Sequence, residues 1–118
     1  MRVVKCDVTA FDSIKNAIEE GINYFGKIDV LVNNAGFYTI GVLEAATEEH
    51  IRRQVETNLI GLINTTEEML PHFREHKAGT IINLSSVAGR TTVPLQSLYI
   101  LLNMLTLLLI FYIYSSNV

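Results

Sequence analysis

Two apolar segments of this 118-residue chain each end in a short polar stretch whose side chains could bind a small molecule. Residues 28–32 run into Asn33 to Gly36, and residues 80–84 run into Ser85 and Ser86. Open α/β sheets bind ligands just beyond the carboxyl ends of their strands. If both segments are strands, these amide and hydroxyl groups lie where a ligand would bind. An ordinary Asn-Gly turn is the alternative interpretation of residues 33–36 taken alone.

The composition argues against several other kinds of site. The net charge is −3 with a pI of about 5.5, and Lys and Arg are scattered, so no nucleic-acid-binding surface is indicated. Cys6 is the single cysteine, and no spaced set of Cys and His predicts a metal site. No apolar signal segment follows Met1, so we expect a cytoplasmic protein. His50, His72 and His76 lie among charged residues, so we expect them on the surface.

Hydrophobic periodicity predicts strands that alternate with helices. Residues 28–33 show no alternation, which predicts a strand buried on both faces. A strand, a helix and a second buried strand form a βαβ unit. The predicted fold is α/β, a partial Rossmann-like parallel sheet of about three strands flanked by helices. The predicted elements are strand 3–7, a helix from Asp12 or Ser13 to Phe25 closed by Gly26, strand 28–33, a helix capped by Thr47 with a kink or break at Pro71, and strand 80–84.

Five features in order along residues 3–99 resemble the short-chain dehydrogenase/reductase family. Asp7-Val8-Thr9 is similar to the family's adenine-side motif, and Asn33 to Gly36 is similar to its central-strand motif N-N-A-G. Asn58, in T-N-L-I-G, falls where the family has a structural and catalytic Asn. Ser86 and Tyr99 follow with the family's typical spacing between serine and tyrosine.

The resemblance implies an oxidoreductase that uses NAD or NADP to transfer hydride to a carbonyl or from an alcohol. In such enzymes the nicotinamide carries the hydride, and the protein supplies a proton and holds the substrate oxygen. Tyr99 would be the proton donor, Ser86 the residue that polarises the substrate, and Asn58 the support. The implied cofactor-binding residues are Asp7, Val8, Asn34, Ala35 and Gly36. Without the family pattern, Asn58 would be a helix-side amide, Ser86 a loop hydroxyl and Tyr99 a packing aromatic.

Two departures from the family pattern concern the residues that would hold and use the cofactor. The chain contains no T-G-x-x-x-G-x-G loop, whose amides and helix N-terminus would hold the pyrophosphate. Asn103 stands four residues after Tyr99, where the family has a Lys whose charge activates the phenol. We therefore expect the chain to be inactive by itself. Half of a split enzyme is an alternative.

The C-terminal part of the chain differs in composition from the rest. No charged residue follows Arg90, and the family pattern stops after Tyr99. We therefore divide the chain into a family-like domain, 1–98, and an apolar tail, 99–118, for which we expect a helix. An out-of-frame reading of the gene would explain the tail. The alternative is a non-catalytic, membrane-associated protein anchored by residues 98–114, which are near the short limit for a spanning helix.

The predicted sheet leaves strand edges unpaired. The resemblance implies the sheet order 3-2-1-4-5-6-7, of which this chain would hold only the third, fourth and fifth strands. Unpaired apolar edges promote association with other chains. We therefore expect self-association or aggregation, together with a small carbonyl or alcohol substrate and no nucleic-acid partner.

Overall fold

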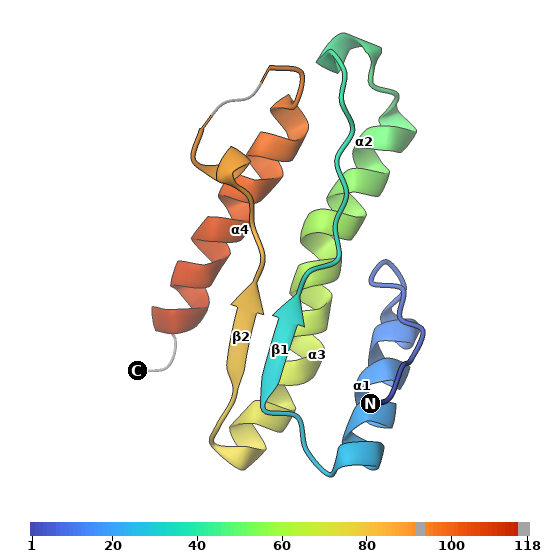
Figure 1. Cartoon of the computed structure of the whole chain (residues 1–118), viewed down its shortest axis with the longest axis vertical. Helices are drawn as coiled ribbons and strands as arrows, with labels where there is room; N and C mark the ends of the chain where they lie inside the picture. Colours follow the sequence, from blue (N-terminus) through green and yellow to red (C-terminus); the bar gives the residue numbers. More distant parts are fainter. Residues whose placement is uncertain (92–93, 116–118) are drawn as a thin grey trace.

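The computed structural model describes residues 1–91 and 94–115, with side chains as far as Leu107. Figure 1 shows two neighbouring strands with helices behind and beside them. The elements in chain order are α1 (Phe11–Phe25), β1 (Val30–Asn33), the 3-10 turn η1 (Leu43–Ala45), α2 (Glu48–Val55), the π-helical turn η2 (Glu56–Ile60), α3 (Gly61–His76), β2 (Thr80–Asn83), the 3-10 turn η3 (Val87–Gly89) and α4 (Ser97–Ser115).

The sheet consists of β1 and β2, which pair in parallel with Val30 opposite Thr80 and Asn33 opposite Asn83. The α/β class with a partial parallel sheet is thus confirmed, with two strands in place of about three. The predicted strand 3–7 is wrong, because residues 1–7 form no regular element. They run beside α1, where Arg2 pairs with Glu20, and Figure 1 shows them away from the sheet. A β-branched segment becomes a strand only where a neighbouring strand accepts its hydrogen bonds.

One face of the sheet packs against helices, and the described residues leave the other face open. Asn33 is buried and its Nδ2 donates to Thr66 Oγ1 of α3 over 3.0 Å. Val30 and Val32, which point to the opposite face, are 47% and 50% exposed. The prediction that this strand is buried on both faces is therefore wrong. Within the described residues α3 covers only the Asn33 face, and α1 packs on α3.

Local sequence explains where α1 begins and ends. Its apolar positions recur at helical spacing, and Ile14 is fully buried. Gly26 closes the helix with φ of 84°, a conformation that favours glycine, and its N–H donates to Ile22 O over 2.8 Å. The helix starts at Phe11, slightly before the predicted cap at Asp12 or Ser13.

The second helical segment begins as predicted and contains a π-helical turn that the sequence did not predict. Thr47 caps α2 by accepting the His50 N–H over 3.2 Å. The sequence predicts a kink or break at Pro71, and the helix continues past it to His76, so there is no break there. The irregularity is the π turn at Glu56–Ile60, where the backbone hydrogen-bonding pattern widens by one residue.

His72 belongs to the core and not to the surface, contrary to the sequence prediction. It is 9% exposed, and its Nε2 accepts the Ile28 N–H over 3.1 Å. It therefore joins α3 to the segment that enters β1. Met69 and Phe73, on the same side of α3, are also buried.

The α4 helix extends from Ser97 to Ser115 and packs against η3 and the end of β2. The apolar C-terminal helix expected from the sequence is thus present. Across the described part of the chain, no helix is long and apolar enough to cross a membrane. Much of the segment considered as an anchor, from residue 108 to 114, lies beyond the described side chains.

Candidate active site

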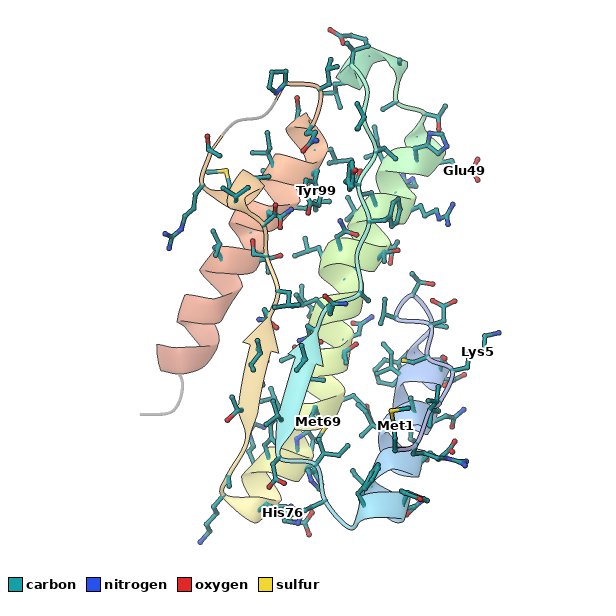
Figure 2. The ribbon with its side chains drawn as sticks, in the orientation of Figure 1. Met1, Lys5, Glu49, Met69, His76 and Tyr99 are labelled. Atoms are coloured by element: carbon teal, nitrogen blue, oxygen red, sulfur yellow. The ribbon has the colours of Figure 1, made fainter. Side chains whose placement is uncertain are left out.

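A cavity of about 240 Å³ lies at the carboxyl ends of β1 and β2. The loop after β1 forms one side, and α4 forms another through Tyr99, Leu102, Asn103 and Thr106. Figure 2 shows Tyr99 near the start of α4, on the side that faces the loop. The remaining lining comes from Asn33, Asn34, Ala35, Gly36, Phe37, Tyr38, Asn58, Leu62, Leu84 and Ser85.

Asn58 fixes the loop after β1 through two hydrogen bonds to one backbone unit. Its Oδ1 accepts the Phe37 N–H over 3.0 Å, and its Nδ2 donates to Phe37 O over 2.7 Å. The side chain projects from the π turn η2, a type of irregularity that is frequent at functional sites. Gly36 lies against it, since a Cβ on Gly36 would be 3.4 Å from Asn58 Oδ1. The amide thus sets the position of the loop that lines the cavity.

Gln54, one helical turn before Asn58, supports the same loop. It is only 1% exposed, its Nε2 donates to Phe37 O over 3.3 Å, and its Oε1 accepts from Thr39 Oγ1 over 3.3 Å. Sequence reasoning missed this residue. The available signal was its spacing of one helical turn from Asn58, which places both amides on one helix face.

The two serines after β2 have different surroundings. Ser86 Oγ accepts the Ala88 N–H over 3.2 Å and so caps η3. Ser85 lines the cavity, and its Oγ donates to Asn103 Oδ1 over 3.1 Å. The sequence singled out Ser86, but the lining of the cavity includes Ser85 in its place.

Asn103 joins the serine loop to the helix that carries Tyr99. Besides accepting from Ser85, it donates from Nδ2 to Tyr99 O over 2.8 Å, and it is only 7% exposed. The Tyr99 ring lies beside that of Tyr38, with the centroids 5.6 Å apart. A neutral, hydrogen-bonded amide therefore occupies the position where the resemblance implies a Lys.

A comparison of the sequence with models of known protein families identifies the family of this chain. A family model described as short chain dehydrogenase matches residues 1–100. The chain belongs to the short chain dehydrogenase family.

Relatives in this family share the sequence over most of the chain. An uncharacterized oxidoreductase of Schizosaccharomyces pombe is 44% identical over 82% of this chain and 41% of its own length. A 3-ketodihydrosphingosine reductase of Bacteroides thetaiotaomicron is 41% identical over 84% of this chain and 37% of its own. The chain therefore spans about two fifths of the length of the curated relatives that it matches.

Solved structures of the same family have the same fold over the shared region. The ligand-free aldohexose dehydrogenase of Thermoplasma acidophilum matches with a TM-score of 0.84 and 30% identity, covering 90% of this chain and 42% of the neighbour. The structure of ElxO with NADP bound matches with a TM-score of 0.77 and 30% identity, covering 83% and 40%.

Asp7 and Val8, which resemble the family's adenine-side motif, lie outside the lining of the cavity. Asp7 Oδ1 accepts the Thr9 N–H over 2.9 Å and the Thr9 hydroxyl over 2.7 Å, and these bonds lower the pKa of the carboxyl group. Val8 packs on Gly61 at the start of α3, where a Cβ would come within 2.8 Å of the Val8 backbone oxygen. The structure thus brings Asn34, Ala35, Gly36, Asn58, Tyr99 and Asn103 to one cavity, and leaves Asp7, Val8 and Ser86 outside its lining.

The lining of the cavity indicates which chemical groups it suits. Amide, hydroxyl and aromatic groups line it, and none of the lining residues is charged. Such a surface suits a neutral ring and a carbonyl group. It offers no cation to a diphosphate, which proteins bind with charge-assisted donors or a helix N-terminus. Within the described residues no group of three His, Cys, Asp or Glu side chains could hold a metal ion.

Proposed function

We propose that the chain carries part of the active site of an oxidoreductase that transfers hydride between NAD or NADP and a small carbonyl or alcohol. The observation that supports this most directly is the cavity at the strand ends, where Tyr99 faces a loop fixed by Asn58. Family membership and the NADP-bound structural neighbour support it independently.

In this proposal the nicotinamide supplies or accepts the hydride when it is bound. The Tyr99 hydroxyl gives a proton to the carbonyl oxygen during reduction and takes it back during oxidation. Ser86 lies outside the cavity lining, so its role as donor to the substrate oxygen rests on the family resemblance; its Oγ accepts from Ala88, and its O–H remains available to donate. Asn58 acts by positioning the loop, because its side chain is engaged by the Phe37 backbone.

Asn34, Ala35 and Gly36 would contact the cofactor in this proposal, since they line the cavity opposite Tyr99. Asp7 and Val8 would contribute at the adenosine end. Residues 1–118 contain neither a glycine-rich phosphate loop nor a cation in the cavity. We therefore propose that the 118-residue polypeptide has no turnover by itself.

The test adds to the chain the cofactor-binding segment that residues 1–118 lack. An N-terminal extension adds a βαβ segment with the family's glycine-rich loop, and both Asn103 and Asn103→Lys versions are made. NADPH fluorescence first establishes that the cofactor binds. Single-turnover oxidation of NADPH with a panel of ketones then measures hydride transfer.

In at least one of the two versions we expect ketone-dependent oxidation of NADPH. Adding Tyr99→Phe to that version should lower the rate at least 100-fold. Tyr24→Phe, which removes the same hydroxyl from an exposed position on α1, should leave the rate unchanged. Bound cofactor without hydride transfer in both versions would refute the proposed function.

A further inference from the structure

A second cavity, of about 140 Å³, lies between the loop at residues 39–46, the first turns of α2 and the start of α4. Most of its side chains are apolar, and no Asp, Glu, Lys or Arg lines it. Its larger apolar residues are Ile40, Val42, Leu43, Ile51, Leu95 and Leu98, and the lining also includes small and polar residues, among them Ala46 and His50.

Specific backbone contacts hold this cavity together. The Gly41 N–H donates to Leu95 O over 3.1 Å, which joins its two loops. Leu95 has φ of 63°, a left-handed conformation that costs a non-glycine residue energy and that clusters at ligand-binding sites. On the α2 side, Gln54 is buried and accepts from Thr39. The walls are therefore set by hydrogen bonds and not by apolar contact alone.

The linings of the two cavities include residues that are adjacent in sequence at two places, one of them beside the residue proposed to transfer the proton. Tyr38 lines the larger cavity and Thr39 lines the smaller one, while Leu98 lines the smaller and Tyr99 the larger. The ring centroids of Tyr38 and Tyr99 lie 5.6 Å apart, which brings the two segments together beside Tyr99. A molecule whose oxygen lies at Tyr99 could therefore place an attached group in the smaller cavity.

We infer that the smaller cavity binds an apolar group of about six carbon atoms, an aryl ring or a short alkyl segment, on the carbonyl or alcohol substrate. This inference rests on the proposed function for its placement beside Tyr99. Size supports it, because an apolar cavity of about 150 Å³ holds a benzene molecule. Chemistry supports it as well, since no Asp, Glu, Lys or Arg side chain lines the cavity to pair with an ionic substituent.

The test uses the full 118-residue chain with labelled Ile, Leu and Val methyl groups, followed by nuclear magnetic resonance. Benzyl alcohol is the apolar probe and glycerol the polar one. We expect saturable shifts at Ile40, Ile51 and Leu98 with benzyl alcohol, and at least tenfold weaker binding of glycerol. Val30 and Val32, on the open face of the sheet, report non-specific adsorption.

Two variants test whether benzyl alcohol binds in this cavity. Ala46→Phe places a ring where Ala46 lines the cavity, and should weaken benzyl alcohol binding at least tenfold. Ala78→Phe makes the same change at an exposed position between α3 and β2, and should leave binding unchanged. If Ala46→Phe fails to fold, Leu43→Asn makes the exposed rim polar and should also weaken binding.

The inference is overturned if the cavity methyl groups show no saturable shifts, or if they shift no more than Val30 and Val32. The same holds if binding is unaffected by Ala46→Phe and Leu43→Asn. Probe binding needs neither cofactor nor hydride transfer. A chain that binds benzyl alcohol in this cavity but fails the NADPH experiment refutes the proposed function alone.

Discussion

Replacing Asn103 with Lys would restore the residue type that the family resemblance implies, yet the structure predicts that it destabilises this chain. Asn103 is 7% exposed, accepts from the Ser85 hydroxyl and donates to Tyr99 O. A Lys side chain cannot accept a hydrogen bond, and it would place an ammonium group in a site with no carboxylate among the lining residues.

The magnitude follows from two contributions. Loss of the two amide hydrogen bonds costs about 1 kcal/mol each in the free energy of unfolding. Burial of an unpaired ammonium costs several kcal/mol, but the adjoining cavity and the long Lys stem let the charge approach water, which reduces the cost. We therefore expect Asn103→Lys to lower the unfolding free energy by about 3 kcal/mol. For a chain of this size that is a fall of about 10 °C in melting temperature.

Thermal unfolding followed by circular dichroism measures the effect. Asn103→Ala removes the hydrogen bonds without adding charge and should cost about 1–2 kcal/mol. Met104→Lys adds a cation at the neighbouring, half-exposed position of α4 and should change stability by less than about 0.5 kcal/mol. If Asn103→Lys melts within 2 °C of the original chain, the argument that the amide forms a buried connection is wrong.

Four further predictions concern other parts of the chain. Calorimetry of the 118-residue polypeptide with NAD and NADP should detect no binding, and a micromolar dissociation constant would contradict this. His72→Leu should lower the unfolding free energy by about 1–3 kcal/mol because the Ile28 N–H loses its acceptor, and denaturant unfolding equal to the original would exclude that role. Thr9→Ala should raise the pKa of Asp7, as measured by carboxyl chemical shifts. The hydrogen bonds from Thr9 lower the pKa of Asp7 in the folded chain, so they stabilise the folded state at pH values above the ordinary pKa of an Asp carboxyl group. This stabilisation is lost as the pH falls through the lowered pKa of folded Asp7. An unchanged pKa in Thr9→Ala would refute the assignment. Finally, if the tail is an out-of-frame reading, one nucleotide restored after the Tyr99 codon should give Lys four codons later. That codon would join the last base of the Leu102 codon to the AA of the Asn103 codon, so it encodes Lys only if that base is A. Any other base there ends the hypothesis.

The sequence by itself determined the elements whose signals are local. The apolar spacing and Gly26 predicted α1, Thr47 predicted the start of α2, and the apolar segments predicted β1 and β2. Each of these signals acts within a few residues, through helix periodicity, capping or backbone conformation. The order of motifs along the chain also carried the family resemblance, which the family match later confirmed.

Only the tertiary structure decided which polar groups meet. Residues 3–7 have strand-like composition but no strand beside them, so they run along α1. His72 is buried, and its acceptor nitrogen receives the N–H of Ile28, a residue far away in sequence. Ser85 lines the cavity and Ser86 does not, and the Ser85 hydroxyl donates to Asn103 of α4. In each case the partner lies on a distant segment, and a hydrogen bond across the fold depends on the packing of elements that no local pattern specifies.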